Sequence, residues 1–259
     1  MKIGIFDSGV GGLTVLHEAM TKIPQGEFYY YGDLDHVPYG TKDKECIYQL
    51  TQQALDYLLE KGLDGFVLAC NTATSAAAAE LRQHYALPII GMEPAVKPAI
   101  QKSNGKKTLV LATAFTLKEK KLQDLLHRLH AEDRVDLLPM GQLVHLAEKA
   151  CFDPAVLKQV MDEALTGYHM QDYDTLVLGC THFVYYKALL QSYFKGSLDV
   201  IDGNAGTVNH LMARLGVAPD SGPFNGRVQY FVSGREVDGG HFRPFMDYLD
   251  RVAQMLTWF

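Results

Sequence analysis

Two cysteines in closely similar surroundings are the strongest chemical feature of this sequence. The segments VLACNT (residues 67–72) and VLGCTH (residues 177–182) each place a cysteine, Cys70 or Cys180, between an apolar run and polar residues. A cysteine where a buried strand meets a helix is placed for chemistry. Two such cysteines in matching halves of one chain predict a single site with a thiol on each side. The alternative is that both are core residues, because cysteine is among the most buried residue types.

The surroundings of each cysteine predict how its thiol behaves. The start of a helix offers unpaired backbone N–H groups and a positive dipole end. We therefore expect thiolate to be favoured over thiol at both positions, and a substrate carboxylate to be held by the same N–H groups without arginine. His182 places an imidazole beside Cys180, where it can donate or accept a proton. Cys46 and Cys151 have no comparable neighbours and are interpreted as structural.

Three further segments carry candidate polar groups. The glycine-rich stretch DSGVGG (residues 7–12) is neither a Walker sequence nor the dinucleotide pattern G-x-G-x-x-G. Its glycines permit close backbone approach, and Asp7 either points an acid into the site or caps the next helix. Tyr39, in a predicted turn, is either a substrate contact or a surface turn residue. Glu148, considered alone, is a solvated helix residue.

The elements that must position these residues follow from the hydrophobic pattern. Short apolar runs alternate with amphipathic segments, which is typical of an α/β protein with a parallel sheet. Asp43 is predicted to cap a helix that runs to Lys61 and stops at Gly62. The predicted strands are residues 2–7, 28–32, 65–70 and 88–91, then 108–112, 135–138, 175–180 and 198–201. A tail follows, with a helix over 208–215, a strand over 228–232 and a helix over 242–258.

The two series of strands have the same layout, so we predict an internal duplication. The expected fold is two pseudo-symmetric α/β lobes with mainly parallel sheets and the active site in the cleft between them. Ligands of such sheets bind at the carboxyl ends of the strands, where both cysteines fall. The first lobe is predicted to comprise residues 1–94 and 208–259, and the second lobe residues 95–207.

Composition excludes several classes of protein. The 259 residues are 47% hydrophobic and 21% charged, with a net charge of −6, which is ordinary for a soluble globular protein. Basic residues are scattered, which argues against binding nucleic acid. No apolar run reaches the roughly 20 residues that span a bilayer, and no signal peptide is evident, so we expect a cytoplasmic protein. The four cysteines form no C-x-x-C pair, and no metal site is predicted.

With these segments placed, the chain resembles the glutamate racemase family, within the cofactor-independent aspartate/glutamate racemase superfamily. The resemblance covers nearly the whole length and depends on several segments in the right order. These segments are IGIFDSGVGG (residues 3–12), PYGTK (38–42), ACNTAT (69–74), GCTH (179–182) and VSG (232–234). The chain departs from the usual pattern at residues 183–186, where FVYY replaces the more common YPLL.

The resemblance implies roles for individual residues. Cys70 and Cys180 correspond to the acid/base pair, Asp7 and His182 to groups that assist the thiols, and Glu148 to a further acidic assistant. The implied substrate-contacting residues are Ser8, Pro38, Tyr39, Gly40, Asn71, Thr72 and Thr181. The resemblance also implies glutamate as the small-molecule substrate, no cofactor, a homodimer, and a D-glutamate product that feeds peptidoglycan synthesis.

A racemase must remove a proton from one face of Cα and deliver another to the opposite face. Thiols suit this task, because a free pKa of about 8.5 leaves both protonation states accessible. Our hypothesis is that Cys70 as thiolate deprotonates D-glutamate while Cys180 as thiol protonates the other face, with the roles reversed for L-glutamate. The alternatives are a racemase of aspartate or another amino acid, a non-catalytic carboxylate-binding protein, and a flavodoxin-like nucleotide module.

Overall fold

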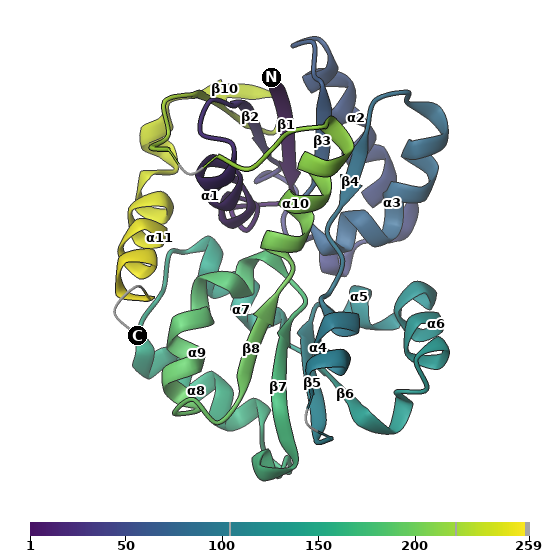
Figure 1. Ribbon diagram of the computed structural model, residues 1–259, viewed down its shortest axis with the longest axis vertical. Helices are drawn as coiled ribbons and strands as arrows, with labels where there is room; N and C mark the ends of the chain where they lie inside the picture. The colour runs from purple at the N-terminus through teal and green to yellow at the C-terminus, as the bar shows by residue number, and fades with distance from the viewer. Residues whose placement is uncertain (104, 221, 257–259) are drawn as a thin grey trace.

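The chain forms two α/β lobes, one above the other, each built on its own sheet (Figure 1). A computed structural model describes residues 1–103, 105–220 and 222–256. The first sheet has six strands in the order β10-β9-β2-β1-β3-β4, and the second has four in the order β6-β5-β7-β8. Among the described strands, every pairing is parallel except that of β10 with β9. The predicted fold class is confirmed.

Each predicted strand is present, with its ends displaced by no more than about two residues. The first sheet contains β1 (Lys2–Asp7), β2 (Glu27–Gly32), β3 (Gly65–Leu68), β4 (Ile89–Gly91), β9 (Arg227–Val232) and β10 (Arg235–Val237). The second contains β5 (Lys107–Ala112), β6 (Val135–Pro139), β7 (Tyr173–Leu178) and β8 (Asp199–Asp202). The prediction missed β10, whose three residues are too few to show an alternating pattern.

The predicted duplication is visible in the order of the strands. The first four strands are arranged β2-β1-β3-β4, and the next four repeat this order as β6-β5-β7-β8. In each half the second strand lies on one side of the first strand, and the third and fourth strands lie on its other side. A ligand crevice forms at such a switch point, outside the carboxyl ends of the strands. Asp7 ends β1 and Cys70 follows β3 in one half, and Thr113 and Cys180 follow β5 and β7 in the other.

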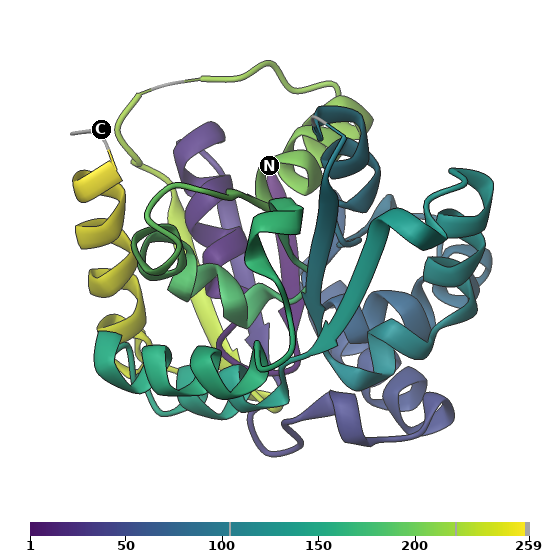
Figure 2. The ribbon, with the colours of Figure 1, turned by 90° about the horizontal axis from the view of Figure 1, so that it is seen from below.

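Helices cover the faces of both sheets (Figures 1 and 2). The first lobe carries α1 (Leu13–Lys22), α2 (Lys44–Leu59), α3 (Asn71–His84), α10 (Asn204–Leu215) and α11 (Arg243–Leu256). The second carries α4 (Val96–Lys102), α5 (Ala114–Lys118), α6 (Lys120–Arg128), α7 (Gly141–Glu148), α8 (Pro154–Ala164) and α9 (Lys187–Tyr193). The domain bounds predicted from the sequence, 1–94 with 208–259 and 95–207, stay a prediction.

The predicted helix signals are partly confirmed. The Asp43 side chain caps α2 by accepting a hydrogen bond from the N–H of Cys46 at 2.8 Å. The helix ends at Leu59 rather than at Lys61, and Gly62 follows with a φ of 73°, a left-handed conformation that glycine adopts readily. The last predicted helix is α11, and its predicted continuation to Trp258 lies outside the described residues.

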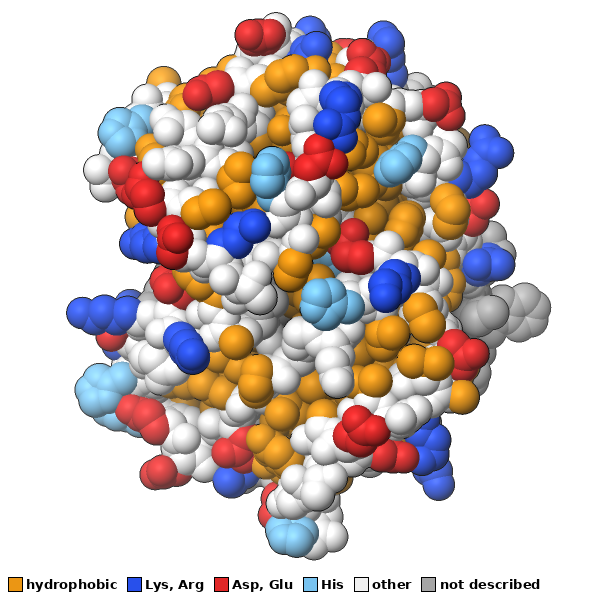
Figure 3. Space-filling model, turned by 180° about the vertical axis from the view of Figure 1, so that it is seen from behind, with side chains coloured by type: hydrophobic (Ala, Val, Ile, Leu, Met, Phe, Trp, Pro, Cys, Tyr) orange, Lys and Arg blue, Asp and Glu red, His pale blue; other side chains and the backbone are white. Residues whose placement is uncertain are grey.

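Charged side chains of both signs are interspersed over the face shown in Figure 3, and its lysines and arginines do not gather into one patch. Among the described residues, no helix combines the length and the apolar character needed to cross a membrane.

The C-terminal helix α11 links the two lobes through aromatic side chains. The ring of Tyr248 stacks on Phe152 of the second lobe with centroids 4.1 Å apart, and Phe152 stacks on Tyr185 at 5.1 Å. Tyr185, which lies in the segment that departs from the usual family pattern, is fully buried and donates a hydrogen bond to the carbonyl of Val10 at 2.8 Å. The departure therefore builds a contact between the lobes beside the cleft.

The glycine-rich loop after β1 is the surface on which the second lobe docks. A Cβ at Gly9 would lie 1.9 Å from Glu148 Oε1, and a Cβ at Gly11 would lie 2.4 Å from both His182 Nδ1 and Thr181 Oγ1. Real Cβ atoms do not approach other atoms this closely, because the packing of folded interiors leaves no room for the overlap. These glycines therefore permit close approach of the other lobe.

We predict that Gly11→Ala destabilises the protein by roughly 1–3 kcal/mol, because the added methyl group must displace the buried residues 181 and 182. The matched control is Gly206→Ala in α10, where a Cβ meets nothing within 4 Å, and where alanine should be neutral or stabilising by about 0.5–1 kcal/mol. Urea unfolding followed by circular dichroism measures both. Equal stability of the two variants would contradict this account of the loop.

Candidate active site

A cavity of about 120 Å³ lies between the carboxyl ends of the two sheets. It is lined by Ser8, Pro38, Tyr39, Gly40, Thr41, Cys70, Thr72, Thr113, Ala114, Pro139, Gly141, Val144, His145, Cys180 and His182. Within this lining there is no lysine, arginine, aspartate or glutamate. A charged ligand would therefore be held by neutral hydroxyl and N–H groups, by the thiols and by the histidines.

Cys70 enters the cavity from the first lobe. The backbone stays extended past the end of β3, since the N–H of Ala69 still bonds to the carbonyl of Phe6, and Cys70 then becomes the N-cap of α3. Its Sγ accepts a hydrogen bond from the N–H of Ala73 at 3.4 Å and donates to Ser8 Oγ at 3.5 Å. The predicted strand-to-helix position of this thiol is confirmed.

The predicted preference of Cys70 for the thiolate form is wrong for this structure. Burial, with a further contribution from the nearby carboxylate of Asp7, raises the pKa of Cys70 to about 12. The hydrogen bonds with Ser8 and Ala73 lower the pKa but do not offset the loss of hydration. Without substrate, Cys70 is therefore a thiol.

Cys180 enters the cavity from the second lobe, after β7. A helix does follow this cysteine, but it begins as a 3-10 helix, Thr181–Tyr186, before α9 starts at Lys187. Its Sγ makes no capping bond, and lies instead 3.7 Å from Nδ1 of His182.

His182 connects Cys180 to a carboxylate. Its Nε2 lies 2.5 Å from Oε1 of Glu148, the last residue of α7, and that oxygen also accepts a hydrogen bond from the N–H of Val10 at 2.9 Å. Burial alone would lower the pKa of His182, but its contacts with Cys180 and Glu148 raise it well above the ordinary value. The imidazolium form is thus held between a thiol and a carboxylate.

Asp7 is fully buried behind the cavity and does not line it. It accepts hydrogen bonds from the N–H of Gly9 and from Thr181 Oγ1, both at 2.9 Å. Burial raises the pKa of Asp7, while His182 and the two hydrogen bonds oppose the rise. The alternative role as a cap of α1 is wrong, because α1 begins after Gly12 with no side-chain cap.

The structure separates the predicted substrate contacts into two groups. The residues that line the cavity are Ser8, Pro38, Tyr39, Gly40 and Thr72. Asn71 and Thr181 are outside the lining, and the Thr181 hydroxyl is directed to Asp7 instead. Tyr39 is 1% exposed and donates to Asp33 Oδ2 at 2.6 Å, so the alternative of a surface turn residue is wrong.

The prediction missed cavity residues of the second lobe. Thr113 caps α5 and pairs with Thr72 of the first lobe at 3.0 Å between hydroxyl oxygens. The other missed residues are Ala114, Pro139, Gly141, Val144 and His145 of the second lobe, and Thr41 of the first. Thr113 and Pro139 lie at the carboxyl ends of β5 and β6, so the rule that selected Cys180 would also have found them.

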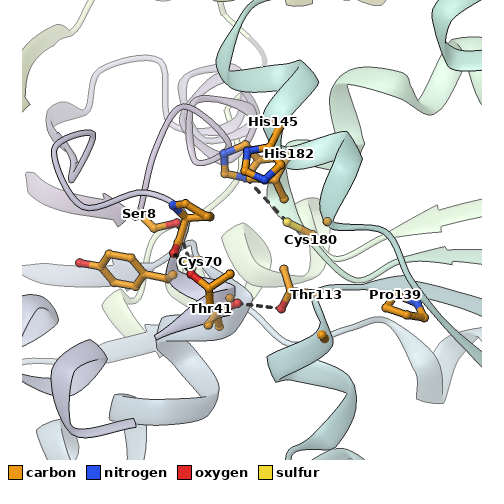
Figure 4. Close-up of a pocket in the computed structure, with 15 residues that line it drawn as sticks. Ser8, Thr41, Cys70, Thr113, Pro139, His145, Cys180 and His182 are labelled. Carbon is orange, nitrogen blue, oxygen red and sulfur yellow. Dashed lines mark hydrogen bonds between the residues drawn. The ribbon is translucent and has the colours of Figure 1, made fainter. Parts of the chain in front are cut away.

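The resulting arrangement has one thiol from each lobe (Figure 4). Ser8 and Cys70 lie on one side of the cavity, and Cys180 lies on the other with His182 beside it. Two groups that exchange protons can therefore address opposite sides of one small ligand. Among the described residues, no group of three or more His, Cys, Asp or Glu side chains could hold a metal ion.

Comparison with known proteins shows which family this chain resembles. The sequence profile of the Asp/Glu/Hydantoin racemase family matches residues 12–211. A glutamate racemase of Halothermothrix orenii is 44% identical over 97% of this chain and 100% of its own. The crystal structure of glutamate racemase from Campylobacter jejuni aligns with a TM-score of 0.80, at 31% identity, over 94% of this chain and 95% of that chain.

An Escherichia coli glutamate racemase, solved with L-glutamate and the activator UDP-MurNAc-ala, aligns with a TM-score of 0.76 at 28% identity, over 96% of this chain and 94% of that chain. The profile spans most of the sequence, and the relatives carry the same two-lobed fold. The chain therefore belongs to the Asp/Glu/Hydantoin racemase family.

Proposed function

We propose that this protein is a glutamate racemase, which interconverts L- and D-glutamate without a cofactor by proton transfer between two thiols. The observation that carries the proposal is the pair of cysteines that enter one cavity from opposite lobes. The relatives named above support glutamate as the substrate. The structure of the Escherichia coli relative with L-glutamate supports it further.

In the proposed reaction, one thiolate takes the proton from Cα and the opposite thiol gives a proton to the other face. The first thiolate becomes a thiol and the second thiol becomes a thiolate, so charge and protons balance. Cys70 serves D-glutamate and Cys180 serves L-glutamate, an assignment that comes from the family resemblance. Hydroxyl and N–H groups of the cavity hold the carboxylates and stabilise the charge that develops on them.

The two thiols reach the thiolate form by different means. A thiolate on Cys180 is paired with the imidazolium of His182, which Glu148 keeps protonated. A thiolate on Cys70 lies near the carboxylate of Asp7, which disfavours it. The ammonium group of a bound amino acid near Ser8 and Asp7 would reverse that effect. Substrate binding thus supplies the positive charge that favours the thiolate form of Cys70.

We also propose that the product serves peptidoglycan synthesis, that the enzyme acts in the cytoplasm and that it forms a homodimer. These three proposals rest on the resemblance to glutamate racemases.

We predict that Cys70→Ser and Cys180→Ser each lower racemisation by at least about 100-fold, because a hydroxyl is too weak an acid to take a thiol's place. Circular dichroism with each enantiomer of glutamate and of aspartate, together with deuterium exchange at Cα, measures the loss and the substrate preference. Cys46→Ser and Cys151→Ser, which lie outside the cavity lining, are the matched controls. A single active-site variant with near-normal racemisation would rule out the two-thiol mechanism.

We predict that Glu148→Gln lowers kcat/KM by roughly 10- to 100-fold at mildly alkaline pH. Removal of the carboxylate lowers the pKa of His182, so the imidazolium is lost at a lower pH and the alkaline limb of the pH profile moves toward acid. The enantiomers are equal in free energy, so kcat/KM must shift equally in both directions.

Initial rates from pH 6 to 10 would measure this shift. Glu163→Gln on the exposed side of α8 is the control and should leave the profile in place. An alkaline limb that does not move in Glu148→Gln would show that this carboxylate does not tune His182.

A further inference from the structure

One wall of the cavity is a loop of the first lobe, residues 33–43, which connects β2 to α2. It contributes Pro38, Tyr39, Gly40 and Thr41 to the lining. The loop also reaches the second lobe, because a Cβ on Gly40 would lie 3.1 Å from Thr113 Cβ. Its position therefore decides the width of the cavity between the lobes.

The carboxylate of Asp33, which is 3% exposed, anchors this loop. Its Oδ2 accepts a hydrogen bond from the hydroxyl of Tyr39 at 2.6 Å. Its Oδ1 lies 2.8 Å from Nδ1 of His36 and accepts a bond from Ser233 Oγ at 2.8 Å. A buried carboxylate with several donors has a well-defined orientation, because each lost partner leaves an unsatisfied charge.

Ser233 comes from a distant part of the sequence, the turn between β9 and β10. Its O–H group donates to Asp33, and its oxygen also accepts a hydrogen bond from the N–H of Asp35 at 3.1 Å. Its backbone N–H bonds to the carbonyl of Gly32 at 3.0 Å. Ser233 thus contacts both the carboxylate that holds Tyr39 and the backbone at the start of the loop.

The conformation of Ser233 itself is unusual. Its φ is 45°, in the left-handed region, and the next residue, Gly234, has a φ of 83°. A non-glycine residue in this region carries a steric penalty. Glycine would relieve that penalty but would lack the hydroxyl. The hydroxyl is therefore what serine contributes at this position. Ser233 lies in the VSG segment of the family resemblance, for which the two-thiol mechanism offers no role.

We propose that Ser233 is a positioning residue for substrate binding, which acts through Asp33 and Tyr39 to hold the loop wall of the cavity. The proposal rests on the proposed function, since the wall is assigned to glutamate binding. The loop touches neither Glu148 nor His182 in the contacts described above. A loosened wall should therefore weaken ground-state and transition-state binding alike, which raises KM and leaves kcat unchanged.

The test uses two variants that lack the hydroxyl, Ser233→Ala and Ser233→Gly, in the full chain. We expect both to raise KM for glutamate by roughly three- to tenfold, with kcat within about twofold of wild type. The glycine variant carries no steric penalty at this φ, so a rise shared by both is due to the hydroxyl. Arg235→Gln breaks an ion pair between the same hairpin and Asp35 of the loop, and should leave KM unchanged because an exposed ion pair contributes little.

A double-variant cycle identifies the route of the effect. In the Tyr39→Phe background, which lacks the hydroxyl that Asp33 holds, Ser233→Ala should change KM by less than about twofold. An equal rise in both backgrounds would overturn the proposal, because Ser233 would then act independently of Tyr39. A fall in kcat with KM unchanged would overturn it as well, since that result indicates a general loss of folded enzyme.

A spectroscopic readout separates this proposal from the proposed function. In protein labelled with 3-fluorotyrosine, the ¹⁹F resonance of Tyr39 is identified by its absence from Tyr39→Phe. It should shift or broaden in both Ser233 variants and stay in place in Arg235→Gln. An unmoved resonance overturns the positioning role. If wild type does not racemise glutamate, the proposed function fails, and the resonance still decides whether Ser233 holds the loop.

Discussion

One carboxylate oxygen, Oε1 of Glu148, is the contact on which the site depends, because it joins the two lobes beside the cavity. It accepts the N–H of Val10 from the first lobe and lies 2.5 Å from Nε2 of His182 in the second. Both partners can reach one atom only if the loop backbone lies directly against the histidine. The missing side chains of Gly9 and Gly11 make that approach possible. The glycine-rich loop therefore serves lobe docking rather than phosphate binding.

The duplicated scaffold holds two thiols in unequal environments. Cys70 caps a full α-helix and lies near a buried carboxylate, whereas Cys180 precedes a 3-10 turn and lies near an imidazole. Burial dominates on the first side and keeps the thiol protonated, because the dipole of a helix start is worth less than the hydration that is lost. Two halves with the same strand order thus place their thiols beside different polar groups.

The C-terminal segment with β9, β10 and α11 belongs to neither repeat, but it contacts residues around the cavity. Strand β9 pairs with β2 in the first sheet and brings Ser233 to the loop wall of the cavity. Helix α11 then stacks Tyr248 on Phe152 of the second lobe. The tail therefore touches both the cavity wall and the opposite lobe. A segment that belongs to neither repeat can constrain the distance between them, because it is bonded to one and packed on the other.

The sequence by itself determined the strands of each half, the positions of both cysteines at strand ends and the identity of the glycine-rich loop. These features follow from local patterns, in which apolar runs, caps and glycines report on residues a few positions away. Local sequence also pointed to His182 and Asp7, and the family resemblance added Glu148 as a candidate; the structure brings all three together around the thiols.

Only the tertiary structure decided which hydroxyls face the cavity and how far burial raises the pKa of the Cys70 thiol. Thr181 is turned to Asp7, Thr113 is turned to Thr72, and the pKa of Cys70 is raised by burial. Each of these outcomes depends on contacts between residues far apart in the chain, and on how much water remains around them. Local sequence cannot report such distances, because they are set by the docking of one lobe on the other.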